Sequence, residues 1–97
     1  MENFFTEELK NFYKAILELK SEEECRKFFE DICTIKELRD ISQRLEVASM
    51  LSNKKSYQEI VKETGASTTT ICRVNKCIMY GGGGYKTVLD RIDKGEK

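Results

Sequence analysis

The chain has 97 residues and no proline, and its apolar residues recur every three or four positions rather than every second one. Proline breaks helices, and spacing of three to four places apolar side chains on one helix face. Both features predict an all-α protein. By the usual size of domains we expect a single domain over residues 1–97. Because so short a chain buries a small core, association of identical chains would add stability.

The apolar pattern and its polar boundaries predict six helices. Three segments, residues 21–24, 34–37 and 56–59, have Ser or Thr followed three positions later by Glu, the capping box that begins a helix. In the first box we expect Glu24 to bond the amide of the capping Ser21. The exit of the third helix is expected at residues 53–55, and a final helix follows the glycine run 81–84. The expected apolar faces are Phe5, Leu9, Phe12, Tyr13, Ile16 and Leu17; Cys25, Phe28, Phe29 and Ile32; Leu38, Ile41, Leu45, Ala48 and Leu51; and Tyr85, Val88, Leu89 and Ile92.

The segment YQEIVKETGASTTTICRVN has the spacing of a helix-turn-helix, which we place at about residues 56–80. Gly65 supplies the sharp turn and Ala66 permits close packing. The inner face is expected to consist of Ile60, Val61, Ile71 and Val74. The outer face of the second helix would then carry Thr68, Thr69, Cys72, Asn75 and Lys76. Short threonines can approach base edges, and basic side chains can bond bases or phosphates, so this pattern favours a DNA reader.

Local charge agrees with that interpretation more than the overall balance does. The net charge is zero, which by itself argues against a phosphate-binding surface. Residues 1–43, however, carry seven basic against eleven acidic side chains, whereas residues 44–80 carry six against three. We expect a DNA phosphate to bind at the helix N-terminus near Ser67 and Thr68. The residues expected to contact DNA are Lys54, Lys55, Tyr57, Gln58, Lys62, Ser67, Thr68, Thr69, Cys72, Arg73 and Lys76.

The composition argues against several other classes of function. With no histidine, the chain has no Ser-His or Cys-His pair for nucleophilic catalysis and no mixed cysteine-histidine zinc site, so we expect neither an enzyme nor a cofactor. A zinc site made of all four cysteines stays formally open. For Cys25 and Cys33, which fall on or near the apolar face of a predicted helix, reduced cysteines that act as small core hydrophobes are the favoured interpretation. The four glycines lack the Lys-Ser/Thr of a P-loop. No apolar run could cross a bilayer and no signal peptide is recognisable, so a cytoplasmic protein is expected.

Beyond these local patterns, the whole chain resembles the Trp-repressor superfamily, and in particular its YerC/YecD-type branch. The segments that carry the resemblance are FFEDICTIKELRDISQRLEVASML, SYQEIVKETGASTTTICRVNKCI and GGGGYKTVLDRI. The resemblance implies a bacterial transcription regulator, expected to repress, with six helices in an intertwined homodimer. Two readers about 34 Å apart would then bind a palindromic operator in double-stranded DNA.

In the tryptophan-responsive members of that superfamily, two arginines, threonines and a glycine hold the indole. The matching positions here are Thr34, Arg44, Thr70 and Arg73, but Val74 stands where those members have glycine. The resemblance therefore implies a vestigial effector pocket, obstructed by Val74, and a regulator that works without tryptophan. Two alternatives stay open: a regulator that responds to another small molecule, and a helical dimerisation or adaptor protein that does not read DNA.

Overall fold

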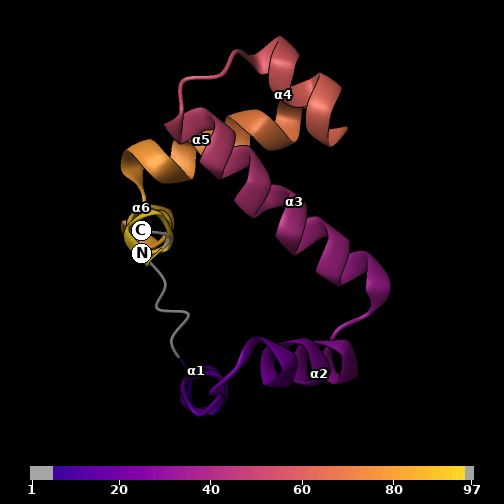
Figure 1. Cartoon of the computed structure of the whole chain (residues 1–97), viewed down its shortest axis with the longest axis vertical. Coiled ribbons are helices and arrows are strands. Elements are labelled where there is room, and N and C mark those ends of the chain that lie inside the picture. Colours follow the sequence, from indigo (N-terminus) through magenta and orange to yellow (C-terminus); the bar gives the residue numbers. More distant parts are fainter. Residues whose placement is uncertain (1–5, 96–97) are drawn as a thin grey trace. The chain divides into compact units, whose positions relative to one another are not determined.

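The computed structural model describes residues 6–95, and in that range it contains six α-helices and no strand (Figure 1). The helices are α1 (Glu7–Leu17), α2 (Glu22–Ile32), α3 (Ile35–Ser52), α4 (Tyr57–Thr64), α5 (Thr68–Tyr80) and α6 (Gly84–Gly95). The prediction of an all-α chain with six helices is therefore confirmed. Phe5, expected on the apolar face of the first helix, lies outside the described residues.

Side-chain caps begin these helices where the sequence places them. At α3, the Thr34 hydroxyl accepts a hydrogen bond from the Glu37 amide at 3.1 Å, and the Glu37 carboxylate accepts one from the Thr34 amide at 2.8 Å. Ser56 and Glu59 form the same reciprocal box at α4. At α2 the prediction was wrong in one detail: Ser21 caps the helix, but Glu24 accepts from the amide of Lys20, at 2.9 Å, rather than from that of Ser21.

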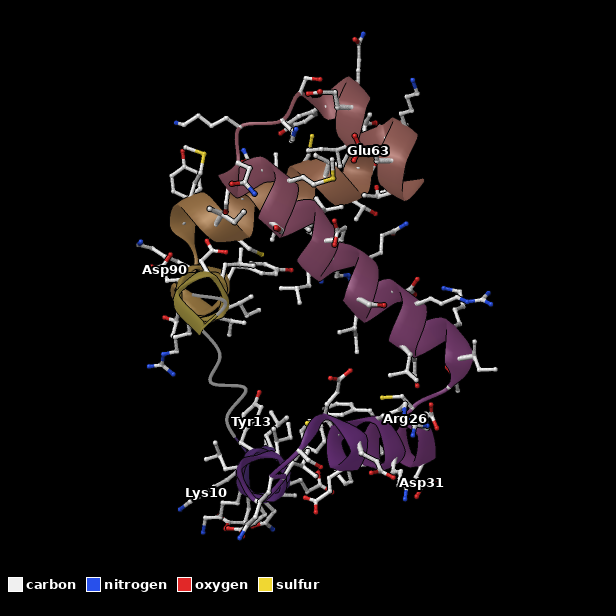
Figure 2. All side chains as sticks on the ribbon, viewed as in Figure 1. Lys10, Tyr13, Arg26, Asp31, Glu63 and Asp90 are labelled. Carbon is white, nitrogen blue, oxygen red and sulfur yellow. The ribbon has the colours of Figure 1, made fainter. Side chains whose placement is uncertain are left out.

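By its internal contacts the chain divides into two units, one ending at Leu38 and the other beginning at Arg39. The expected single domain over residues 1–97 stays a prediction. In the first unit, the ring of Phe12 on α1 contacts those of Phe28 and Phe29 on α2, with centroids 6.2 and 6.4 Å apart. No residue of α1 or α2 is buried, and charged side chains such as Lys10, Arg26 and Asp31 project from these helices (Figure 2).

The second unit contains the core. It is built from Val47, Ala48, Met50, Ile60, Ala66, Ile71 and Val74, with Leu51, Ile78, Tyr85 and Leu89 packed against it. In this unit α4 packs on α5, and α5 packs on α6. The shared core also includes Val47, Ala48 and Met50, which joins the α4-α5 pair to the second half of α3.

Several residues of the expected apolar faces are exposed in the single chain. Ile41 and Leu45, expected on the apolar face of α3, are 50% and 37% exposed, because the core contacts that helix through Val47, Ala48 and Met50. Val61 was assigned to the inner face of α4 but is 37% exposed. In that helix Ile60 is the residue that is buried in the core. Likewise, Ile32 and Cys25 on α2 are exposed, so the predicted buried stripe is reduced to half-buried Phe28 and Phe29.

No helix in the described part of the chain is both long enough and apolar enough to span a membrane.

Candidate nucleic-acid interface

The helix-turn-helix is held rigidly by the core beneath it. Ile60 of α4 and Ile71 of α5 are fully buried, Val74 is 1% exposed and Ala66 in the turn is 2% exposed. Apart from Val61, the predicted inner face is therefore confirmed. Moving these buried apolar side chains into water would raise the free energy of the protein. Their burial therefore fixes the orientation of α5 on the second unit.

The turn itself is fixed by a short hydrogen-bond network. Gly65 ends α4 with a left-handed φ of 75°, as predicted. The Thr64 hydroxyl donates to the Ile60 carbonyl at 2.7 Å and accepts from the Ala66 amide at 3.0 Å. The Gln43 side chain of α3 donates to the Thr64 carbonyl at 3.1 Å, which links the turn to the supporting helix. Sequence reasoning missed this role of Gln43, because a bond across 21 positions leaves no local pattern.

The opposite side of α5 is open. Five of the predicted DNA contacts line one hollow of about 430 Å³ on this side, and we call this surface the reading face: Thr68, Thr69, Cys72, Arg73 and Lys76. All five residues are exposed. Asn75, also expected on the outer face, is half-buried and donates from its amide nitrogen to Met79 Sδ at 3.6 Å. The structure thus brings the predicted contacts of α5 together around one hollow, while Asn75 stays apart.

The start of α5 presents free backbone donors. The Ser67 hydroxyl caps the helix by accepting from the Thr70 amide at 3.1 Å and donating to the Thr70 hydroxyl at 3.2 Å. Among the described residues, no partner occupies the amides of Thr68 and Thr69. Two free amides and the positive end of a helix dipole are suited to a phosphate oxygen. The Ser67 hydroxyl itself is engaged in the cap.

The basic side chains predicted to contact DNA are not neutralised by carboxylates. Lys54 and Lys55 follow α3, and Lys62 lies on α4; like Arg73 and Lys76 they are exposed, and none is in an ion pair within residues 6–95. Tyr57 and Gln58, the other predicted contacts, lie exposed in the first turn of α4. Unpaired cations on the surface are available to phosphates, which is the arrangement that nucleic-acid binding requires.

One carboxyl group near these cations has a perturbed pKa. Hydrogen bonds from the Ser56 amide, at 2.9 Å, and from the Ser56 hydroxyl lower the pKa of Glu59 below its ordinary value of 4.5, and the charge of Lys55 lowers it further. These bonds favour the ionised carboxylate. The charged form of Glu59 therefore belongs to the cap of α4.

The residues matched to an effector pocket have separate surroundings. Thr34 caps α3, Thr70 contacts Ser67 in the cap of α5, and Arg73 lies on the reading face. Val74 is part of the buried core, so its side chain packs against neighbouring apolar groups. Only Arg44 of this set lines the cavity described next.

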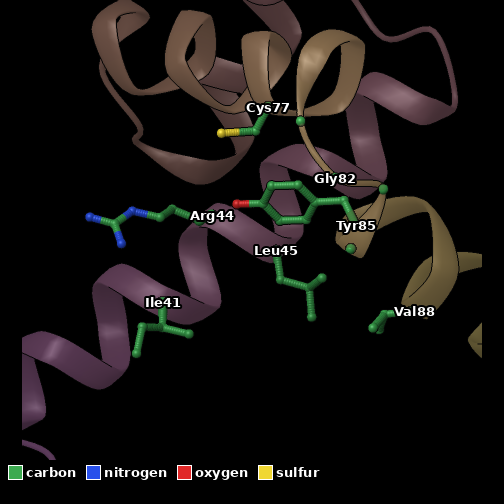
Figure 3. Close-up of a pocket in the computed structure, with 10 residues that line it drawn as sticks. Ile41, Arg44, Leu45, Cys77, Gly82, Tyr85 and Val88 are labelled. Carbon is green, nitrogen blue, oxygen red and sulfur yellow. The ribbon is translucent and has the colours of Figure 1, made fainter. Parts of the chain in front are cut away.

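That cavity, of about 650 Å³, lies between α3, the end of α5 and the start of α6 (Figure 3). Ile41, Leu45 and Val88 form its apolar wall, the Tyr85 ring extends into it from α6, and glycines 81–84 border it. From the sequence, the glycine run 81–84 is predicted only as a break between helices, and the cavity is not predicted. Ile41, Leu45 and Val88 are exposed and line the same cavity, although they lie on two helices far apart in the sequence. Their proximity is apparent only once α3 and α6 are placed together, so the sequence contains no signal for it.

The cysteines do not pair or cluster. All four are free thiols; Cys25, Cys72 and Cys77 are exposed, and Cys33 is half-buried. The expectation of core cysteines is therefore wrong for Cys25. Within residues 6–95, no group of three or more Cys, Asp or Glu side chains is arranged to hold a metal ion.

Comparison with known proteins agrees with this geometry. Residues 7–93 match the Trp repressor protein family. The chain belongs to the Trp repressor family. Within it, the YerC protein of Bacillus subtilis is 49% identical over 89 residues, which cover 92% of this chain and 86% of YerC. The predicted resemblance to a YerC-type Trp repressor is therefore confirmed.

Two solved structures have the same Trp repressor fold. A candidate Trp repressor from Staphylococcus aureus superposes with a TM-score of 0.88 at 42% identity, over 92% of this chain and 89% of its own. A TrpR-like protein from Eubacterium eligens superposes with a TM-score of 0.88 at 46% identity, over 91% of each chain. The six-helix Trp-repressor fold predicted for this chain is thus confirmed.

Proposed function

We propose that this protein is a sequence-specific DNA-binding transcription regulator that acts as a homodimer through α4 and α5, and that it represses transcription. The observation that carries the proposal is the reading face: an exposed, uncompensated basic hollow on α5, backed by a helix-turn-helix whose inner face is buried. Membership of the Trp repressor family supports the same function. The protein performs no catalysis in this proposal.

The reading face enters the major groove, whose width admits one α-helix. Thr68, Thr69 and Cys72 approach base edges, while Arg73, Lys76 and the lysines around α4 contact phosphates. The free amides at the start of α5 donate hydrogen bonds to another phosphate. Contacts to phosphate position the protein, and contacts to bases select the sequence.

A homodimer is part of the proposal because one short α5 covers few base pairs. In a two-fold dimer the two reading faces would bind successive major grooves, about 34 Å apart, and the operator would be a palindrome. Exposed apolar residues on four helices support an intersubunit core: Leu17, Ile32, Ile35, Ile41 and Val88 are between 47% and 82% exposed. Such side chains are stabilised when a partner covers them.

The decisive experiment begins with selection of bound duplexes from a random DNA pool. Affinity for the selected duplex is then measured by fluorescence anisotropy between about 50 and 200 mM salt. If six to ten phosphates are contacted, the affinity falls by about 10³–10⁵ across this range because counterions are released on binding. A protein that binds no duplex at the lowest salt would instead be the adaptor considered above, and the proposal would fail.

Paired variants test the placement of α5. Lys76→Ala is expected to weaken binding to selected and unselected duplexes alike, whereas Thr69→Ala is expected to reduce the preference between them. Lys14→Ala on α1 is the matched control, because it removes an exposed lysine remote in sequence from α4 and α5. Equal and negligible effects of both reading-face variants would contradict this placement.

We further propose that regulation does not use tryptophan. Val74 fills the core at the position where the tryptophan-responsive proteins have glycine, and Arg44 and Arg73 lie in different surroundings, one beside the apolar cavity and one on the reading face. Titration calorimetry with tryptophan is expected to give no binding heat. Saturable binding at micromolar concentration would overturn this part of the proposal. Another small molecule beside Arg44 would be detected by the same titration with a panel of ligands.

A further inference from the structure

The walls of the hollow on α5 have a restricted chemistry. Thr68 and Thr69 each expose a methyl group beside a hydroxyl, and Cys72 exposes a thiol, which behaves as a small hydrophobe and a weak hydrogen-bond donor. Arg73 and Lys76 complete the lining, and no carboxylate or amide side chain contributes to it. In fact α5 contains no Asp or Glu over its whole length. The reading face thus offers small apolar groups and cations.

This chemistry discriminates among the four base pairs. Carboxylates accept from the cytosine amino group, paired amides read adenine, arginine and lysine read guanine, and small apolar groups contact the C5 methyl of thymine. The amide that α5 does contain, on Asn75, is half-buried and bonded to Met79. The groups required for specific contact with cytosine and adenine are therefore missing from the hollow, whereas the cations that can read guanine and the small apolar groups that contact the thymine methyl are present.

The apolar groups on α5 are close enough along the helix to contact one methyl group of a base together. Thr68 and Thr69 lie in the first turn, and Cys72 follows one turn later on the same side, as their shared hollow confirms. The N-terminal residues of a recognition helix are those that contact base edges. A methyl projecting into the major groove would reach the hollow between the threonines and Cys72.

We infer that the reading face recognises the C5 methyl of a pyrimidine in each half-site, seated between Thr68, Thr69 and Cys72. This inference rests on the proposed function and adds the chemical class of the base that is read. Burial of one methyl changes affinity about fourfold, so loss of one methyl from each half-site of a palindrome weakens binding about fifteenfold.

The test replaces each thymidine of the selected duplex by deoxyuridine, one symmetric pair of positions at a time. This change removes the C5 methyl and leaves the hydrogen-bonding groups intact. At one or two positions per half-site we expect about fifteenfold weaker binding in anisotropy titrations. Cytosine at the same position is expected to bind more tightly once it is converted to 5-methylcytosine.

Protein variants connect the effect to α5. Thr68→Ser and Thr69→Ser keep the hydroxyl and delete the methyl of the side chain, so at least one should reduce the penalty for deoxyuridine to about fourfold or less in a double-mutant cycle. Thr87→Ser, at an exposed position on α6, is the matched control and should retain the full penalty. Thermal melting followed by circular dichroism checks that each variant is folded.

The outcomes separate the inference from the proposed function. If the protein binds DNA specifically but deoxyuridine at every position changes the affinity by less than twofold, the inference is overturned and the proposed function stands. A penalty that is identical in wild type, Thr68→Ser and Thr69→Ser also overturns it, because the methyl would then act through DNA shape. Failure to bind any duplex at low salt overturns both.

Discussion

At the scale of single residues, Lys54 combines backbone strain with a charge that is predicted to contact DNA. It adopts a φ of 63°, in the left-handed region that favours glycine. Its amide donates to the Leu51 carbonyl and the Lys55 amide donates to the Met50 carbonyl, each at 3.0 Å, which closes the end of α3 in a Schellman motif. The strained position holds one of the predicted phosphate contacts, and glycine there would lose that charge.

Lys54→Gly is therefore expected to stabilise the protein while weakening its binding to DNA. Relief of the left-handed strain, partly offset by the greater entropy of glycine in the unfolded chain, should raise the free energy of unfolding by about 0.5–1 kcal/mol. Urea denaturation measures the change. Lys55→Gly is the control, because it removes the same charge without relieving a positive φ. If the two variants have equal stability, the strain at Lys54 has no energetic weight.

Gly81, which ends α5, is required for steric reasons. A Cβ atom at this position would lie 2.5 Å from the Cys77 carbonyl oxygen, whereas one at Gly82 would meet nothing within 4 Å. Gly81→Ala is expected to lower the free energy of unfolding by about 1–3 kcal/mol, since backbone must shift to admit the methyl. Gly82→Ala should change it by less than about 0.5 kcal/mol. Equal melting temperatures for the two variants would contradict the geometry at Gly81.

At the scale of helices, the capping box of α4 links local stability to pH. The pKa of Glu59 is lowered by its bonds to Ser56, so the folded chain binds this proton less readily than the unfolded chain does. The stabilisation is complete above the unfolded pKa of about 4.5 and is lost as pH falls through the lower folded pKa.

Glu59→Gln should remove this contribution. We expect the variant to be less stable than wild type at pH 7, and the difference to shrink as the pH is lowered below about 4. Thermal melts at a series of pH values measure it. Glu63→Gln, on the same helix and outside the capping box, is the control (Figure 2 places Glu63 on α4). A stability difference that stays constant from pH 7 to pH 3 would show that the charge of Glu59 has no part in the cap.

At the scale of the whole molecule, the two units differ in how much of their apolar surface is buried. The second unit has a core of seven buried side chains, whereas α1 and α2 have none. Leu17 at the end of α1 is 82% exposed and Ile35 at the start of α3 is 71% exposed. In the proposed homodimer these side chains contribute to a core shared by both subunits.

Leu17→Gln tests that role. Burial of a leucine side chain contributes about 1.5–3 kcal/mol, and a two-fold dimer contains two copies, so the dimer dissociation constant should rise at least tenfold. Sedimentation equilibrium measures the constant. Lys14→Gln, in the same helix at an exposed polar position, should leave it unchanged. Wild-type protein that sediments as a monomer at micromolar concentration would refute the homodimer.

Interactions spanning three or four residues were predictable from sequence alone. The boxes at Thr34 and Ser56, the left-handed turn at Gly65 and the cap at Ser67 all form as expected, because each depends on residues adjacent in one helix. The inner face of α5 was predictable for the same reason: Ile71 and Val74 lie on one side of a single turn. These local features were enough to place the reading face.

Burial in the other helices depended on which neighbours fold against them. Periodicity predicts that Ile41, Leu45 and Ala48 form one apolar face of α3. The core instead contains Ala48 together with Val47 and Met50, because these side chains pack in one cluster with Ile60 of α4 and Ile71 of α5. The bond from Gln43 to Thr64 and the cavity beside Tyr85 arise from contacts between distant segments. The sequence by itself therefore determined where helices begin and end and which side of α5 faces out. Only tertiary structure decided which apolar faces are covered, since burial is a property of two surfaces in contact.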